Sequence, residues 1–308
     1  MIGPVVFAES SLASRVRFHQ AWYRAAVLRI ESYGSSPSPK GPIARGSVLP
    51  VADAQAGKNF ISKNVFDTYL ARRAQGWGVD PVRCTSFMTS SQTLTFNVFG
   101  PLLSNSAWFC RVLSTVLDMD VHGIDRAEIE YAPARPSLAL GDKTRLDLWM
   151  LLQTDIGTLS LAVEVKYVDR FNSRYLPVWT NTRYQRLLEE KGAYWDFTEP
   201  VTRSRTINQL LRCHALSVFL SPSADAPPAH LLVLHHPDDQ SAQKVVDEYV
   251  TATKPHSSVL RTTINTLFDV MLDCAETTDQ RITAHLLFDR YVKHDLSEAS
   301  WQLSNTRQ

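Results

Sequence analysis

The chain is poor in several features that mark common classes of protein. Its four cysteines are scattered and include no Cys-x-x-Cys pair: Cys84, Cys110, Cys213 and Cys274. That scatter argues against a zinc site or a disulfide framework, and reduced thiols are typical of a cytoplasmic protein. No run of eighteen apolar residues is present, and the N-terminus has no basic stretch before its short apolar patch. The sequence therefore predicts neither a membrane span nor a signal peptide.

A charge excess and a glycine-rich phosphate loop are also missing. The 308 residues carry a formal net charge of +1, so total charge does not mark a nucleic-acid-binding protein. Without the loop, nucleotide-dependent chemistry has little support. The nine histidines show no metal-ligand spacing, and we interpret His235-His236 as packing at a strand end. The length is ample for a buried core in one large domain or two smaller ones.

Apolar periodicity predicts helices on both sides of a strand-rich block. Helices are expected over 11–31, 63–75, 105–118, 205–220, 240–253, 258–274 and 279–293, and strands over 127–132, 145–153, 158–168 and 230–236. The segment 32–48 is rich in Ser, Pro and Gly and reads as a loop, and Gly100-Pro101 reads as a turn before a helix. This order predicts an α/β three-layer sandwich, with a central mixed sheet between helical layers.

Two neighbouring strands of this block place charged side chains on one face. The turn "TDIG" at 154–157 joins them, and an even-length loop pairs residues whose numbers sum to 311. Asp147 then lies opposite Glu164, and Lys166 shares their face because side chains alternate along a strand. Leu146, Leu148, Met150 and Leu152 are then expected on the other face, with Leu159, Leu161, Val163 and Val165. A three-residue loop would instead turn Asp147 toward the apolar side.

Two carboxylates and an ammonium on one face suggest hydrolytic chemistry. The carboxylates of Asp147 and Glu164 repel each other, and a divalent cation such as Mg²⁺ or Mn²⁺ relieves that repulsion. The carbonyl of Val165 could add a third ligand. Lys166 could orient a water and stabilise charge that develops on a phosphate. An ordinary solvated strand face explains a lone Glu-x-Lys equally well, so the partner acid in register decides the interpretation.

With these residues the chain resembles the PD-(D/E)XK nuclease superfamily, which has the restriction-endonuclease-like fold. The signature is Asp147 on one strand and Glu164-Val165-Lys166 on the next, with Leu146 where a proline often stands. The chain also resembles one branch of the superfamily, a group of restriction-endonuclease-like proteins. Four segments carry this resemblance: "AGKNFIS" (56–62), "SSQTLTFNVFGPL" (90–102), "VEVKY" (163–167) and "INQLLRCHAL" (207–216).

The resemblance implies an α-β-β-β-α-β core, a divalent metal such as Mg²⁺ or Mn²⁺, and cleavage of phosphodiester bonds in nucleic acid. We expect a helical extension over 1–95, a nuclease-like core over 96–255 with an insert at 169–204, and C-terminal helices over 256–308. Members often carry a further acid on the first core helix, but the helix at 105–118 has none before Asp118. Glu128 and Glu130 on the preceding strand are candidates, and Glu130 is the one we add to the metal ligands.

Further polar residues are candidates for substrate contacts. Gln209, on the helix after the signature strand, is counted among the catalytic residues and could hold Lys166 or a phosphate. Gln92 is another polar candidate, although its segment reads more readily as a loop or cap. The insert interleaves arginines with aromatic residues, a combination that suits phosphates and bases, although a structural insert with surface charges fits as well. The arginines expected to bind nucleic acid, and DNA in particular, are Arg170, Arg174, Arg183, Arg186 and, on the helix, Arg212.

Two other hypotheses remain open at this point. A non-catalytic nucleic-acid-binding protein could keep the same fold, and the missing helix acid favours it. An unrelated α/β enzyme could contain the Glu-x-Lys by chance. The first hypothesis predicts no binding of a divalent metal, and the second predicts a parallel sheet without an acidic cluster.

Overall fold

A five-stranded mixed sheet lies at the centre of the computed structural model, which describes residues 1–4, 11–171, 174–192, 194–223 and 225–305. Its strands are β3 (Val121–Tyr131), β4 (Leu146–Thr154), β5 (Gly157–Lys166), β6 (His230–His235) and β7 (Val259–Thr263), side by side in that order. β3, β4 and β5 pair antiparallel, whereas β5, β6 and β7 pair parallel. The mixed sheet predicted from the sequence is therefore confirmed.

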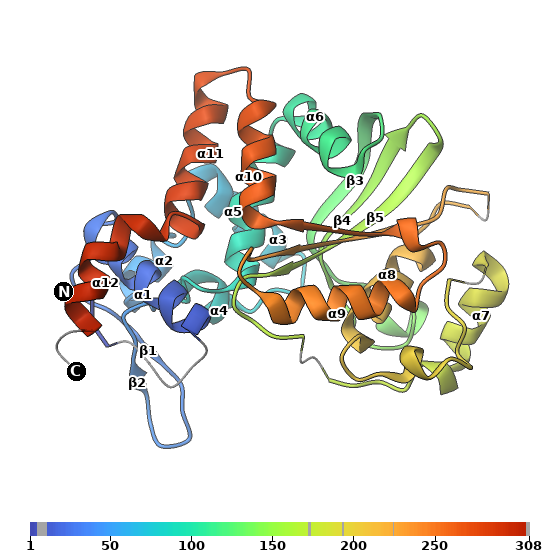
Figure 1. Cartoon of the computed structure of the whole chain (residues 1–308), viewed down its shortest axis with the longest axis horizontal. Coiled ribbons are helices and arrows are strands. Elements are labelled where there is room, and N and C mark those ends of the chain that lie inside the picture. The colour runs from blue at the N-terminus through green and yellow to red at the C-terminus, as the bar shows by residue number, and fades with distance from the viewer. Residues whose placement is uncertain (5–10, 172–173, 193, 224, 306–308) are drawn as a thin grey trace.

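Helices cover both faces of the sheet and complete three layers (Figure 1). On one face lie α3 (Lys63–Ala74), α5 (Ser91–Leu103), α6 (Ser106–Leu117), α10 (Ile264–Asp273) and α11 (Thr278–Tyr291). On the other lie α7 (Thr182–Lys191), α8 (Asn208–Phe219) and α9 (Gln240–Thr251). The remaining elements are α1 (Ser11–Ala26), α2 (Val51–Gln55), α4 (Pro81–Ser86), α12 (Glu298–Asn305) and a small hairpin of β1 (Ser35–Ser36) and β2 (Ile43–Ala44).

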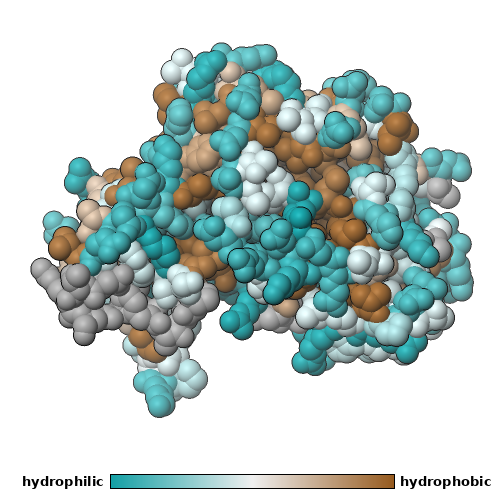
Figure 2. Space-filling model, viewed as in Figure 1, coloured by the Kyte–Doolittle hydropathy of each residue, from teal (hydrophilic) through white to brown (hydrophobic). Residues whose placement is uncertain are grey.

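Each face of the sheet is sealed by its own apolar cluster. Leu148 and Val163 pack into the cluster beneath α5 and α6, whereas Trp149 and Ala162 pack into the one beneath α8. This alternation is the period of two expected for a strand that is covered on both sides. On the outer surface, polar and apolar side chains are intermixed on the face shown in Figure 2. Within the described ranges, no helix is long and apolar enough to cross a membrane.

The β4–β5 hairpin has the register predicted from the sequence. Thr154 pairs with Gly157 across a two-residue turn, and the ladder continues to the pair Leu148–Val163. Gly157 has a φ of +118°, a backbone conformation that glycine adopts without steric cost. The even loop keeps the apolar side chains of both strands on one face, as expected.

Beyond that last pair the two strands separate. The backbone N–H of Val165 donates a hydrogen bond to the Asp147 carboxylate (Val165 N to Asp147 Oδ2, 2.6 Å). Leu146 consequently lies in the cluster beneath α8, and the expectation that it shares a face with Leu148 is wrong. The neighbouring strand bends at the same level, where Glu130 has a left-handed φ of +54°. The sheet thus opens at the end where the charged residues lie.

Two other expectations are corrected by the tertiary structure. The helix expected over 258–274 is strand β7 followed by α10, because Val259–Thr263 completes the parallel edge of the sheet beside β6. Gly100-Pro101 lies inside α5 rather than in a turn. A Cβ at Gly100 would come within 3.3 Å of Val65 on α3, so the glycine permits close helix packing. The three-part domain division remains a prediction.

Candidate functional site

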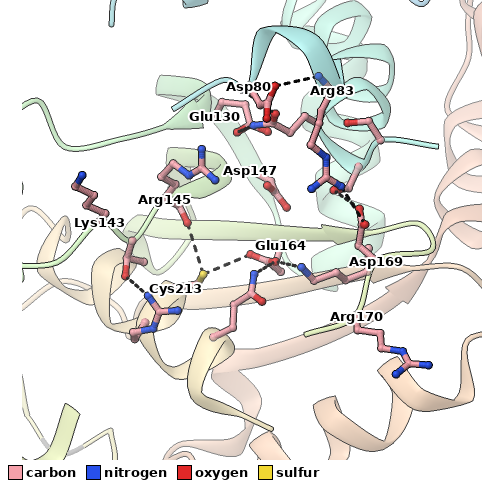
Figure 3. Close-up of a pocket in the computed structure, with 17 residues that line it drawn as sticks. Asp80, Arg83, Glu130, Lys143, Arg145, Asp147, Glu164, Asp169, Arg170 and Cys213 are labelled. Atoms are coloured by element: carbon pink, nitrogen blue, oxygen red, sulfur yellow. Dashed lines mark hydrogen bonds and ion pairs between the residues drawn. The ribbon is translucent and has the colours of Figure 1, made fainter. Parts of the chain in front are cut away.

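A pocket of about 430 Å³ occupies the open end of the sheet (Figure 3). Its lining combines acids, bases and amides from six segments: Asp80, Arg83, Ser90, Ser91, Gln92, Glu130, Lys143, Thr144, Arg145, Asp147, Glu164, Lys166, Asp169, Arg170, Gln209, Arg212 and Cys213. All four residues predicted as catalytic, which are Asp147, Glu164, Lys166 and Gln209, lie in this one pocket. Their roles remain a prediction.

Glu164 is held by three donors on its two carboxylate oxygens. Oε1 accepts from the amide of Gln209 (Nε2, 2.6 Å) and lies 2.7 Å from the Lys166 ammonium. Oε2 accepts from the thiol of Cys213 at 3.4 Å. Glu164 and Lys166 are 3% and 7% exposed, so this ion pair is buried and its geometry is fixed. Phe171 covers the ammonium, with its ring centroid 5.0 Å from Nζ.

Asp147 lies beside this pair on the neighbouring strand. In Figure 3 its carboxylate lies between Glu130 above and Glu164 below. Burial and then repulsion from Glu164 raise the pKa of Asp147 to about 7, although Lys166 and the Val165 N–H oppose the rise. For Lys166, burial disfavours the charged form. Attraction to Glu164 and Asp147 outweighs that cost, and the pKa of Lys166 is raised above its usual value.

A third acid completes the cluster from the edge strand. Glu130 is 1% exposed, and its Oε2 accepts a hydrogen bond from the Gln92 amide at 2.6 Å. Its other oxygen, Oε1, is buried and has no hydrogen-bond partner. Burial and then the charge of Asp147 raise the pKa of Glu130 well above its usual range. A left-handed backbone at a buried glutamate is costly, and such outliers tend to occur at functional sites.

Gln92 therefore lines the pocket, whereas the sequence favoured a loop or cap role over its role as a polar candidate for the site. It stands in the first turn of α5, whose N-cap is Ser90. Of the helices that precede the sheet in the chain, α4 and α5 contribute residues to the pocket lining, whereas α6 contributes none. The helix expected over 105–118 therefore does not line the pocket, and α5 and β3 supply further polar groups to it.

The predicted nucleic-acid-binding arginines divide into two groups. Arg170 and Arg212 line the pocket, and Arg212 Nη1 donates to the hydroxyl of Thr144 at 3.0 Å. Arg174, Arg183 and Arg186 are exposed on the insert and do not line it. Arg183 instead donates to the carbonyls of Ser137 and Ala139, and thereby ties α7 to the segment before β4.

Several lining residues were not identified from the sequence. Arg145 precedes Asp147 by two residues, and Cys213 follows Gln209 by one helical turn, so strand and helix periodicity are the signals that point to them. Lys143 and Arg145 form no ion pair with any acid in the described ranges. On the opposite side, Arg83 pairs with Asp169 at 3.2 Å, and Asp169 also accepts from Ser91. No regular spacing along the sequence relates Arg83, Asp169 and Ser91.

The donor chemistry of the pocket fits a hard divalent cation. Burial and neighbouring acids raise the pKa of two of its carboxylates, Glu130 and Asp147, and Glu130 also has an unpartnered buried oxygen, so a cation would stabilise the cluster. The described residues contain no group of three or more Asp, Glu, His or Cys side chains already arranged around one point. Because Mg²⁺ keeps several waters and needs few protein ligands, two carboxylates suffice for the fit.

The comparisons with known proteins agree with this geometry. A protein-family model described as the PD-(D/E)XK nuclease superfamily matches residues 8–293, which is nearly the whole chain. No curated protein and no solved structure matches the chain.

Proposed function

The chain belongs to the PD-(D/E)XK nuclease superfamily, and from this premise we propose that it hydrolyses phosphodiester bonds of DNA with Mg²⁺ or Mn²⁺. Family membership indicates nuclease activity on nucleic acid, and nucleases of this superfamily generally depend on a divalent metal. The observation that carries the proposal is the convergence of Asp147, Glu164 and Lys166 in one pocket at the open end of the sheet. Asp147 is in hydrogen-bond contact with the strand that carries the other two.

Asp147 and Glu164 would hold the cation, with the Val165 carbonyl and Glu130 as further candidate ligands. When bound, the cation supplies positive charge that lowers the pKa of a water and offsets charge on the phosphate. The Oε1 of Glu130, which has no hydrogen-bond partner, would be stabilised most by the charge of the cation. The fold itself opens room for this group, because β4 leaves β5 at Asp147.

The chain's own residues then position the reaction. Lys166 stays protonated, because two acids raise its pKa, and its ammonium orients the attacking water and stabilises charge on the phosphate. Gln209 fixes the Glu164 carboxylate from α8. Arg170 and Arg212 on the pocket wall bind phosphate oxygens of the substrate. The water oxygen bonds to phosphorus as the bond to the leaving sugar oxygen breaks, so no covalent intermediate is required.

The test is cleavage of plasmid and linear DNA by purified protein with Mg²⁺ or Mn²⁺. Lys166→Ala and Asp147→Ala should each lower the rate by about 100-fold or more, because each removes a group that acts on the reacting phosphate. Asp155→Ala is the matched control, since Asp155 is an exposed acid in the turn at the other end of the same hairpin. Equal cleavage by all four proteins, or cleavage without metal, would refute the proposal.

A second function has one observation in its favour. No ready-made group of three metal-ligating side chains is found in the described part of the chain, as in a fold that binds nucleic acid without cutting it. Calorimetric titration with Mn²⁺ separates the two functions. Binding that Asp147→Ala abolishes supports the nuclease, and no binding to the wild-type protein supports the non-catalytic alternative.

A further inference from the structure

The insert between β5 and α8 carries a surface cluster of two aromatic rings and two guanidinium groups. We call Tyr175, Trp179, Arg203 and Arg205 the arginine–aromatic cluster. Arg203 lies over the Trp179 ring at 5.8 Å, and Arg205 lies over the Tyr175 ring at 5.2 Å. The ring centroids are 5.9 Å apart, with their planes tilted by 54°. The four side chains therefore offer several flat surfaces at one place.

This cluster is fixed beside the candidate active site. Leu176, next to Tyr175, exchanges two hydrogen bonds with the side chain of Asn208: Leu176 N to Oδ1 at 3.0 Å and Nδ2 to Leu176 O at 2.7 Å. Asn208 begins α8 and directly precedes Gln209, whose amide binds Glu164. At its other end, the insert leaves the pocket through Arg170 and the Phe171 ring over Lys166. The cluster is thus joined to the pocket lining through Asn208 and its neighbour Gln209.

The charges of the cluster remain available to a ligand. Arg203 and Arg205 are exposed, as is Arg174 beside Tyr175, and none of these three forms an ion pair with an acid in the described segments. Backbone contacts hold the geometry instead. The hydroxyl of Tyr175 donates to the Arg203 carbonyl at 3.1 Å, and Arg203 Nη2 donates to the Phe197 carbonyl at 3.1 Å. Two exposed guanidinium groups thus lie over two half-buried rings.

We propose that the arginine–aromatic cluster is a stacking platform for an unpaired stretch of the nucleic-acid substrate beside the cleaved phosphate. Unpaired bases stack on aromatic rings and on guanidinium planes, while arginines also bind the phosphates between them. Bases inside a duplex are stacked on one another and do not present their faces. This inference rests on the proposed function and refines it, because it assigns a single-stranded or frayed segment as the preferred substrate.

The test measures binding in EDTA, where no cleavage occurs, by fluorescence anisotropy with a labelled oligothymidine and with a duplex of equal length. Tyr175→Ala and Arg205→Ala should weaken single-strand binding by about tenfold each and duplex binding much less. Tyr175→Phe keeps the ring but loses the hydrogen bond to the Arg203 carbonyl, so it should lose much less single-strand affinity than Tyr175→Ala. Arg205→Ala should also reduce the slope of affinity against salt, since a phosphate contact is lost.

Arg126→Ala is the matched control, because Arg126 stacks on Trp149 at 5.1 Å but does not line the pocket. Its single-strand affinity should equal that of the wild type. Wild-type affinity in both Tyr175→Ala and Arg205→Ala, or an equal loss on duplex, would overturn the platform. If the platform variants behave as expected and the wild type cuts no DNA with metal, the platform stands and the proposed hydrolysis fails.

Discussion

Burial shifts pKa values in opposite directions in two groups of titratable side chains. The acid cluster of Glu130, Asp147 and Glu164 faces a pocket, and burial raises the pKa of Asp147 to about 7. The histidine cluster of His19, His236 and His294 lies where β6 ends against α1 and α11, and burial lowers the pKa of His19 to about 4 and of His294 to about 3. In both groups burial favours the neutral form.

The difference lies in what each cluster can gain from a ligand. The three imidazoles pack on one another, with ring centroids of His294 4.9 Å from His19 and 5.4 Å from His236. They are neutral at physiological pH, and none of them lines the catalytic pocket. The acids cannot pack in this way, because any two that ionise repel each other. Neutral imidazole rings can therefore pack together without a ligand. A cluster of acids instead lowers the free energy of unfolding unless a cation is bound.

After the losses expected for Lys166→Ala and Asp147→Ala, the next largest effect tests the third acid. Glu130→Gln should lower the rate of metal-dependent cleavage by about 10- to 100-fold, because it removes a charge that supports the cation. Glu128→Gln on the same strand is the control, since Glu128 is bound to Arg126 outside the pocket. A Glu130→Gln enzyme as fast as the wild type would restrict the acid cluster to two members.

Acid unfolding should reveal the histidine cluster. Because the pKa of His294 is lowered on folding, its contribution is complete above the unfolded pKa of about 6.5 and is lost as pH falls toward about 3. Between pH 7.5 and 5, the free energy of unfolding of His294→Phe should therefore fall by about 2 kcal/mol less than that of the wild type. Urea titrations at each pH measure this. His122→Phe is the control because His122 is exposed, and the same change there would contradict the assignment.

The acid cluster should have the opposite pH dependence. The pKa of Asp147 is raised on folding, so its contribution is present below the unfolded pKa of about 3.9 and is lost as pH rises through about 7. In EDTA at pH 8, Asp147→Asn should raise the free energy of unfolding by about 1–2 kcal/mol. Near pH 4 the two proteins should be equally stable. Equal urea midpoints at pH 8 would mean that the acids repel less than their positions imply.

The smallest effect concerns the amide that holds Glu164. Gln209→Ala should lower the cleavage rate by about tenfold, because a hydrogen bond to a charged group is lost while the carboxylate remains. Gln153→Ala removes a comparable amide–carboxylate bond, to Asp125 on the surface, and should leave the rate unchanged. Rates measured under single-turnover conditions would separate the two. A similar loss in both variants would show that the effect is general.

The sequence was a good guide to the β4–β5 hairpin and a poor one to its surroundings. Alternation along β4 and β5 predicted both the register and the shared face of Asp147 and Glu164, because the apolar faces permit only one pairing. The same reasoning missed the separation of the strands, since a bend at Glu130 leaves no periodic signal. The strand at Val259–Thr263 was missed because a short apolar run before a helix reads as its first turn.

By itself, the sequence determined the α/β class, the antiparallel hairpin and the acid–acid–lysine set, since each follows from local periodicity and short turns. Only the tertiary structure decided that Gln92 contacts Glu130, that Cys213 contacts Glu164, and that the insert returns to α8 through Asn208. These contacts join residues 38 to 49 positions apart, or hold a long insert against a helix end. The physical reason is that packing of distant segments against the sheet chooses their neighbours, and no spacing along the chain encodes that choice.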